Sequence, residues 1–271
     1  VYFWAHKEKR RFRVATVDHG LRKESTFEAE TVKGLASSMG SMHDTLVWKD
    51  WDNKGNLQAK ASEARSSLLA TWAKKNALNT VLLGHTLNDQ AETVLMRLVR
   101  GSGVDGLCGI YQKKVSHDIV WYRPMIAFDR YELRDFLKEF KISWVDDPSN
   151  EDHRFDRVKS RKVLDNFKGL GLDLQGLAQT ADHMRKARRV LNLAVSDLSK
   201  KVIRVREWGD VEINRKILSD SPEDTCNRLV IFCLQWISGK SYKPRLAELS
   251  NFMASVFEED FTGRTFCGVQ A

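Results

Sequence analysis

The residues of this chain best suited to chemistry gather in the stretch GHTLNDQAET, which ends at Thr93. Asp89 and Glu92 lie three residues apart at an expected helix start, so both carboxylates project from one face of the helix. Such a pair can hold Mg²⁺ or a substrate ammonium group. The alternative is plain helix capping, because Asp and Glu favour the first turn of any helix. The neighbouring His85 and the turn that begins at Arg100 favour the functional interpretation.

A second set of polar side chains comprises Asn150, Arg154, Arg157 and Arg161. Arg157 and Arg161 lie one helical turn apart, so together they could grip a phosphate group. The alternative is a solvated basic face, which is common on surface helices. Residue types and spacing alone leave both interpretations open.

Strand-like and helix-like segments alternate through the first part of the chain. Short apolar or β-branched runs predict strands at 13–17, 45–48, 80–83 and 119–122. Capping residues and helical spacing predict helices that start near Ser25, Asn56, Asp89 and Asp129. This alternation predicts an α/β fold with a doubly wound parallel sheet. Ligands of such sheets lie beyond the carboxyl ends of the strands, which would bring Asp18-His19 and Gly84-His85 to one crevice.

The character of the chain changes after about Asn166. The run Gly169–Gly171 has the composition of a linker, and a long helix with many basic residues is expected over 174–198. A hairpin is expected over 202–213, followed by helices that start near Pro222 and Pro244. We therefore predict a catalytic domain at residues 1–165 and a second, smaller and mainly helical domain at residues 170–271.

The composition is that of a soluble globular protein, with 42% hydrophobic and 30% charged residues. A net charge of +8 favours a polyanionic partner such as nucleic acid, although a solubilising surface charge would explain it as well. No apolar run reaches the roughly 18 residues of a membrane-spanning helix, and no secretory signal is present. The four cysteines have no C-x-x-C pair, which fits reduced thiols and a cytoplasmic location. They are Cys108, Cys226, Cys233 and Cys267.

Four blocks of the chain resemble, in the same order, the motifs of the tRNA(Ile)-lysidine synthetase family. They are VDHGLRKES from Val17, GHTLNDQAETVLMRLVRGSGVDGL from Gly84, RPMIAFDRYEL from Arg123, and WVDDPSNEDHRFDRVKSR from Trp144. Together they lie within about the first 165 residues. The resemblance implies the PP-loop fold, also called the N-type ATP pyrophosphatase fold, which is adenine nucleotide alpha hydrolase-like. Residues beyond these blocks resemble the small linker domain of the family less specifically.

Enzymes of this family use ATP to adenylate the C2 carbonyl oxygen of the wobble cytidine in the isoleucine tRNA with a CAU anticodon. The ε-amine of lysine then displaces AMP to form lysidine. The resemblance therefore implies a carbon–nitrogen ligase that uses ATP and Mg²⁺. Its implied partners are L-lysine and tRNA(Ile) with the CAU anticodon, and a homodimer is left open.

The resemblance also implies site residues, carried over by motif. The implied catalytic residues are Asp89, Glu92, His85 and Arg100, with Asp89 also a metal ligand. The implied nucleotide-binding residues are Asp18, His19 and Gly84. The implied substrate- and RNA-binding residues are Arg65, Asn150, Arg154, Arg157 and Arg161.

The chain departs from the family pattern at three places. The S-G-G-x-D-S loop, whose backbone N–H groups cradle pyrophosphate, does not occur in the sequence. The run Val1–Phe12 has the character of the tail of the following helix, so we expect the loop upstream of Val1. Asn88 stands where the family has its first Asp, while Ser62 and Ser66 replace an Arg and a Tyr.

Two alternatives to a lysidine synthetase remain open. One is a tRNA thiolase of the same fold, which the lack of paired cysteines disfavours. The other is a non-catalytic RNA-binding remnant, which the missing loop suggests. An S-G-G-x-D-S sequence upstream of Val1 would favour the enzyme.

Overall fold

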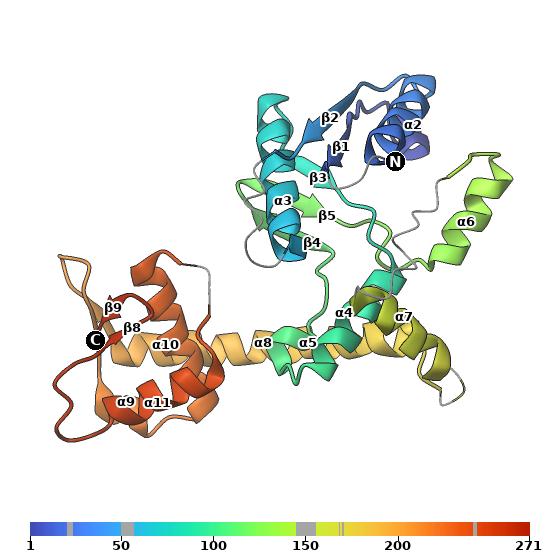
Figure 1. The fold of residues 1–271 in the computed structure, drawn as a ribbon. Coiled ribbons are helices and arrows are strands. Elements are labelled where there is room, and N and C mark those ends of the chain that lie inside the picture. Colours follow the sequence, from blue (N-terminus) through green and yellow to red (C-terminus); the bar gives the residue numbers. More distant parts are fainter. Residues whose placement is uncertain (21–23, 50–56, 145–155, 168, 170, 241–242) are drawn as a thin grey trace. The chain divides into compact units, whose positions relative to one another are not determined.

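The computed structural model describes residues 1–271 except 21–23, 50–56, 145–155, 168, 170 and 241–242 (Figure 1). The side chains at 24–26, 58–59, 156–158, 165 and 167 are also not described. The chain forms two compact units. The first contains Val1–Ser102 and Gly109–Gln179, and the second contains Gly103–Cys108 and Thr180–Ala271.

Parallel strand pairs form the centre of the first unit. β1 (Val14–Asp18) pairs with β2 (His43–Val47), and β3 (Thr80–Leu82) pairs with β5 (Ile119–Tyr122), both in parallel. The four strands predicted from the sequence are confirmed, with ends that differ by at most two residues. β4 (Lys113–Ser116) was not predicted, and it lies antiparallel to β5.

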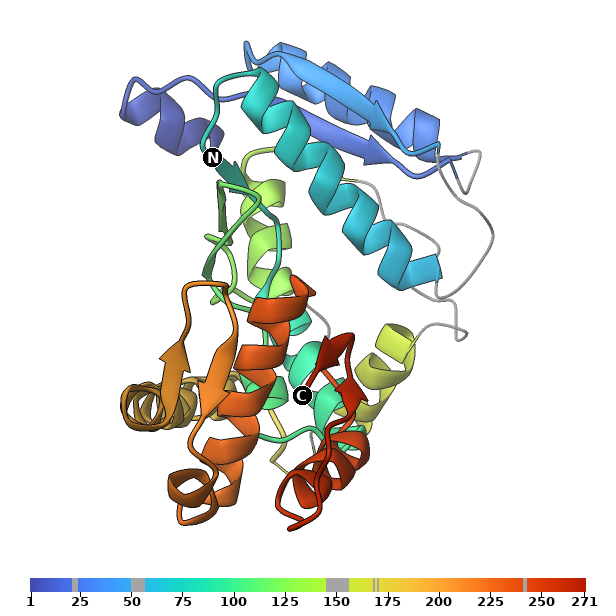
Figure 2. The same cartoon turned by 90° about the vertical axis from the view of Figure 1, so that its left-hand side faces the viewer.

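Helices cover both faces of the β1–β2 pair. Figures 1 and 2 show α2 (Glu24–Ser38) on one face and α3 (Leu57–Lys75) on the other. Trp72 of α3 is buried in one core with Val81 of β3 and Trp121 of β5, and Val17 of β1 packs against this core. Among the described residues the two sheets are not hydrogen-bonded to each other, but both contribute to this core beneath α3. Parallel strands covered by helices confirm the doubly wound α/β class.

Further helices lie in the described part of the first unit. They are α1 (Tyr2–Lys7), α4 (Leu87–Val99), α6 (Arg130–Glu139) and α7 (Asp156–Phe167). The predicted capping box of α6 is confirmed, because the backbone N–H of Asp129 donates to Glu132 at 2.8 Å. α7 packs along α4, so it lies beside the motif that carries the acidic pair.

The second unit is mainly helical. The predicted long helix is α8 (Leu174–Val202), and the predicted hairpin is β6 (Ile203–Val205) with β7 (Val211–Ile213). The elements that follow are α9 (Arg215–Ser219), α10 (Glu223–Ser238), α11 (Leu246–Val256), β8 (Thr265–Phe266) and β9 (Val269–Gln270). Leu229 of α10 and Leu249 of α11 are almost completely buried in its core. None of the helices among the described residues is long and apolar enough to cross a membrane.

The short helix α5 (Val104–Leu107) belongs to the second unit, and its Asp105 carboxylate contacts cations of that unit. Asp105 lies 2.8 Å from Arg188 Nε, 2.8 Å from Arg228 Nη1 and 3.5 Å from Lys243 Nζ. Burial by itself would raise the pKa of Asp105, but the hydrogen bond from Arg228 and the three nearby cations lower it overall. Asp105 therefore joins α5 electrostatically to α8 and α10.

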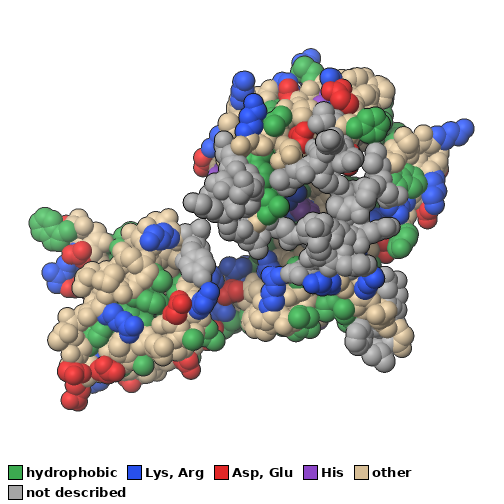
Figure 3. Space-filling view, in the orientation of Figure 1, with side chains coloured by type: hydrophobic (Ala, Val, Ile, Leu, Met, Phe, Trp, Pro, Cys, Tyr) green, Lys and Arg blue, Asp and Glu red, His purple; other side chains and the backbone are tan. Residues whose placement is uncertain are grey.

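Basic side chains are widely distributed on the surface. On the face drawn in Figure 3, Lys and Arg side chains lie among acidic, apolar and other side chains in each unit. The net charge of +8 is therefore not gathered into one continuous patch among the described residues of that face.

Candidate active site

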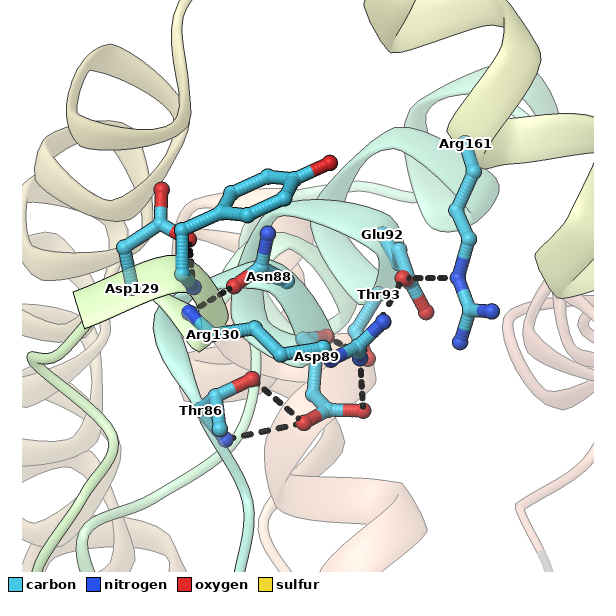
Figure 4. Close-up of polar contacts among 9 residues, drawn as sticks. Thr86, Asn88, Asp89, Glu92, Thr93, Asp129, Arg130 and Arg161 are labelled. Atoms are coloured by element: carbon cyan, nitrogen blue, oxygen red, sulfur yellow. Dashed lines mark hydrogen bonds and ion pairs between the residues drawn. The ribbon is translucent and has the colours of Figure 1, made fainter. Parts of the chain in front are cut away.

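The N-terminus of α4 positions the acidic pair. Thr86 precedes the helix in an extended conformation, and its N–H and hydroxyl both donate to Asp89 Oδ2 at 2.8 Å. Leu87, Val94 and Leu95 bury the opposite side of the helix. This capping uses one oxygen of Asp89, while the other, Oδ1, lies 3.9 Å from Arg130. Asp89 therefore caps the helix and also faces a cation (Figure 4).

Glu92 lies one turn further along α4 and is 1% exposed. Its Oε1 accepts a hydrogen bond from Arg161 Nε of α7 at 2.6 Å and lies 3.9 Å from Arg130 (Figure 4). Its Oε2 is buried and has no hydrogen-bond partner among the described residues. A buried carboxylate oxygen without a donor is costly, so Oε2 is a candidate to contact a ligand or to accept a proton.

Burial dominates the electrostatics of Glu92. Loss of water raises its pKa, and the hydrogen bond and charge of Arg161 only partly oppose this effect. The nearby Asp89 charge raises the pKa further, whereas Arg130 lowers it. A carboxyl with a raised pKa in a site of opposed charges is typical of a residue that transfers protons.

The start of α6 positions Arg130 near Asp89 and Glu92. Its backbone N–H donates to Asn88 Oδ1 at 2.8 Å, and the Leu87 N–H donates to the Phe128 carbonyl at 2.9 Å. These two bonds tie the first turn of α4 to that of α6. Asn88, the departure from the family pattern, thus forms a cross-helix contact that places the guanidinium of Arg130 near both carboxylates.

The carboxyl end of β1 carries Asp18 and His19. Asp18 is buried, and its Oδ1 accepts the N–H of Gly20 at 2.8 Å in a turn where Gly20 has φ +62°. The His19 ring meets Trp48 edge-on at 5.8 Å. Burial lowers the pKa of His19, and the charge of Arg65 lowers it further, while Asp18 opposes them. The charge of Arg65, which lies on the first half of α3, is therefore felt at this strand end.

The segments that follow β3 and β5 carry a second pair of side chains, His85 and Arg123. His85 follows β3, and its Nδ1 accepts a hydrogen bond from Arg123 Nε at 3.2 Å. Burial lowers the pKa of the Arg123 guanidinium, and Arg65 lowers it further. The charge of Arg65 thus lowers the pKa of one side chain at each of these strand ends, and the crevice itself stays a prediction. Gly84 has no backbone strain, and a Cβ there would meet only Met125, at an ordinary 3.6 Å.

The structure does not bring every predicted residue together. Arg100 is the C-cap of α4, and a rise of 1.5 Å per residue puts it roughly 16 Å along the helix from Asp89. Arg161 pairs with Glu92 and does not stand on an open basic face. Asn150 and Arg154 lie outside the described residues, and Arg157 lies on α7 with its side chain not described.

Arg123 and Arg130 were not predicted as site residues. Each lies in the RPMIAFDRYEL block, so the motif held a signal, but only the fold shows which side chain each one meets. Cations beside the acidic pair come from α6 and α7 rather than from Arg100.

The described residues contain no group of three or more His, Cys, Asp or Glu side chains that could hold a metal ion. Asp89 nevertheless fits the role of one Mg²⁺ ligand, because capping uses only its Oδ2. In nucleotide sites Mg²⁺ commonly takes one or two carboxylates and completes its shell with phosphate oxygens and water. Glu92 fits this role less well, since Arg161 already holds its Oε1.

Comparisons with known proteins identify the family of the chain. Residues 1–166 match the PP-loop domain family. The chain is 41% identical over 250 residues to a tRNA(Ile)-lysidine synthase of Ruegeria pomeroyi, covering 91% of this chain and 58% of that protein. It is 35% identical over 263 residues to a tRNA(Ile)-lysidine synthase of Wolbachia pipientis, covering 95% and 60%. The chain thus spans less than two thirds of the length of these curated relatives.

A solved structure shares the fold. It is a U34-tRNA thiolase from Methanococcus maripaludis with its 4Fe–4S cluster, and it superposes with a TM-score of 0.57 at 14% identity. The match covers 68% of this chain and 66% of the thiolase. At this identity the likeness concerns the fold alone.

Proposed function

Because the chain belongs to the PP-loop family, in the branch of the tRNA(Ile)-lysidine synthases, we propose that it joins L-lysine to C2 of the wobble cytidine of tRNA(Ile) with a CAU anticodon. Membership of this family implies the use of ATP. The cytidine O2 is first adenylated with release of pyrophosphate, and the lysine amine then displaces AMP. The observation that carries the proposal is the buried Glu92 oxygen without a partner, in the motif shared with the family.

Glu92 supplies what an amine nucleophile needs. Lysine arrives as an ammonium ion, which must lose a proton before its lone pair can attack. In the proposed step a proton passes to Glu92 Oε2, the amine nitrogen bonds to C2, and the bond between C2 and the adenylated oxygen breaks. AMP leaves with that electron pair. The raised pKa of Glu92 makes it a stronger base than an ordinary carboxylate.

Asp89 and the strand ends hold the nucleotide in this proposal. Asp89 Oδ1 would be one ligand of Mg²⁺, which when bound neutralises charge on the phosphates of ATP. Asp18, His19 and Gly84 would line the nucleotide crevice, and Arg65 of α3 is near enough to lower the pKa of His19 and of Arg123. A glycine at position 84 would let phosphate approach the backbone closely. The roles of Arg100, Asn150 and Arg154, the cytoplasmic location and the homodimer stay predictions.

A thiolase activity finds less support in the side chains. Cys108, Cys226 and Cys233 are buried, and burial raises the pKa of Cys233 to about 11. Burial also raises the pKa of Cys226. Thiols of this kind are poor ligands and nucleophiles, because both roles need the thiolate.

The proposal is tested by incubating the full-length protein with a tRNA(Ile) transcript, ATP and radiolabelled lysine. We expect ATP-dependent label in the tRNA, with one AMP released for each lysine incorporated. A transcript with uridine in place of the wobble cytidine is the matched control and should stay unlabelled. Binding of the tRNA without label or AMP would instead support the RNA-binding remnant.

Replacement of Arg157 by alanine is expected to weaken tRNA binding and to reduce the slope of log K against log salt by about 1. Arg157 lies in the first turn of α7, the helix that also carries Arg161. Lys138→Ala is the control, since Lys138 is an exposed cation on α6 that pairs with Asp135. Filter binding at several salt concentrations measures both slopes. A parental slope for Arg157→Ala would remove this residue from the interface.

A further inference from the structure

The ends of two neighbouring strands bring Arg123 to His85. β3 and β5 are parallel with Leu82 opposite Tyr122, so the residues after them emerge at the same edge. The Leu83 N–H donates to the Tyr122 carbonyl at 2.9 Å and extends this pairing by one residue. The next side chains at this edge meet, because Arg123 Nε lies 3.2 Å from His85 Nδ1.

Arg123 makes further hydrogen bonds besides the one to His85. Its Nη1 donates to the Tyr111 carbonyl at 2.9 Å, and its backbone N–H donates to the Gln112 carbonyl at 2.8 Å. Its guanidinium is therefore held on one side by the segment before β4 and presents Nε–H to the imidazole. The side chain is half-buried, which strengthens a charge-assisted hydrogen bond.

The hydrogen bond between Arg123 Nε and His85 Nδ1 is compatible with only one tautomer of the imidazole. An arginine Nε can only donate, so His85 Nδ1 must be an unprotonated acceptor. A neutral imidazole carries its proton on the other nitrogen, Nε2. Protonation of Nδ1 would replace the hydrogen bond by two N–H groups facing each other beside a full positive charge.

From this geometry we propose that Arg123 is a positioning residue, which holds His85 as the neutral tautomer with its proton on Nε2. His85 therefore acts as a hydrogen-bond donor toward an anionic oxygen rather than as the base for lysine. That leaves proton removal to Glu92, on a different element. The identity of the oxygen, on the ATP phosphate or the adenylated cytidine, rests on the proposed function; the tautomer does not.

The tautomer is measured on the free protein by ¹⁵N NMR, with His85→Gln used to assign the signal. We expect an unprotonated Nδ1, a protonated Nε2, and a scalar coupling across the hydrogen bond between Arg123 Nε and His85 Nδ1. A protonated Nδ1, or the absence of that coupling, would overturn the proposal. The measurement needs no substrate, so it is independent of whether lysidine forms.

Two variants of similar length test the consequence for catalysis. Arg123→Met removes the donor, and we expect kcat for lysidine formation to fall by roughly 10- to 100-fold with KM for tRNA within about twofold. Arg123→Lys keeps a cation that can only donate, and it should recover most of the loss. Thermal melts establish that both variants fold.

A parental kcat for a folded Arg123→Met would show that the contact is structural only. Absence of lysidine formation in the parent protein, with the NMR coupling present, would refute the proposed function and leave the tautomer in place.

Discussion

Replacement of Glu92 by glutamine is expected to lower the rate of lysidine formation by about 10²- to 10⁴-fold without unfolding the protein. Glutamine has the same shape, and its carbonyl oxygen can still accept the hydrogen bond that Arg161 donates to Oε1. What disappears is the negative charge and the ability of Oε2 to take a proton. Steady-state kinetics with the lysine concentration varied would place the loss mainly in kcat.

The same substitution should change how stability depends on pH. Burial raises the pKa of Glu92 in the folded protein above its ordinary value of 4.5. The folded state therefore binds this proton more tightly than the unfolded chain, so ionisation of Glu92 lowers stability as pH rises from 4.5 through the folded value. The Glu92→Gln variant has no ionisable group at this position, so it does not lose stability in this way as pH rises. Its free energy of unfolding should match that of the parent in acid and exceed it at neutral pH.

Urea unfolding at several pH values measures this difference. Glu139→Gln is the matched control, because Glu139 is an exposed carboxylate at the end of α6. We expect that control to keep parental activity. A parent protein more stable than Glu92→Gln at neutral pH would mean that the ion pair with Arg161 outweighs burial. Glu92 would then be structural, and the amine would need another acceptor.

Local signals predicted much of the fold. Thr80–Leu82 and Ile119–Tyr122 are apolar enough to be recognised as strands, and Asp129 with Glu132 marks a helix start within four residues. β4 was missed because Lys113–Ser116 is mostly polar and exposed, so only its pairing with β5 makes it a strand. Antiparallel pairing of this kind depends on the neighbouring strand more than on the sequence of β4 itself.

Contacts between residues that are distant in sequence could not be predicted from local sequence patterns. Asp105 is separated by 123 residues from Arg228 and by 138 from Lys243, so no local pattern assigns α5 to the second unit. Arg123 and Arg130 likewise gain their roles from side chains about 40 residues away in sequence. By contrast, Asp89 and Glu92 were found because their spacing on one helix is itself the signal.

Of the two interpretations of Asp89 offered by the sequence, the structure confirms helix capping, and the functional one stays a prediction. Its Oδ2 caps α4 through Thr86, and its Oδ1 faces Arg130. One carboxylate can therefore start the helix and still offer an oxygen to the site. A substitution that keeps the first role and removes the second would separate them.

Asparagine at position 89 is that substitution. Its amide oxygen can accept the bonds from Thr86, so the helix start and the fold should be preserved, but the negative charge near Arg130 is lost. We expect Asp89→Asn to reduce lysidine formation by at least about 10²-fold while tRNA affinity stays near that of the parent. If Asp89 binds the Mg²⁺ that accompanies ATP, the rate of adenylation should fall by a similar factor. Pyrophosphate release measures this rate.

Glu132→Gln provides the comparison for Asp89→Asn. Glu132 occupies the same position in the capping box of α6, where its Oε2 accepts the Asp129 N–H at 2.8 Å. Both changes neutralise a capping carboxylate, although Asp89 accepts two bonds from Thr86 and Glu132 accepts one. The general cost of weakened capping should therefore be of the same order in the two variants, about 0.5–1 kcal/mol or less. Only Asp89→Asn should lose ligation. Parallel losses of tRNA affinity and thermal stability in Asp89→Asn would show that capping alone explains this residue, because a ligand of metal or amine can be neutralised without disturbing the helix that carries it.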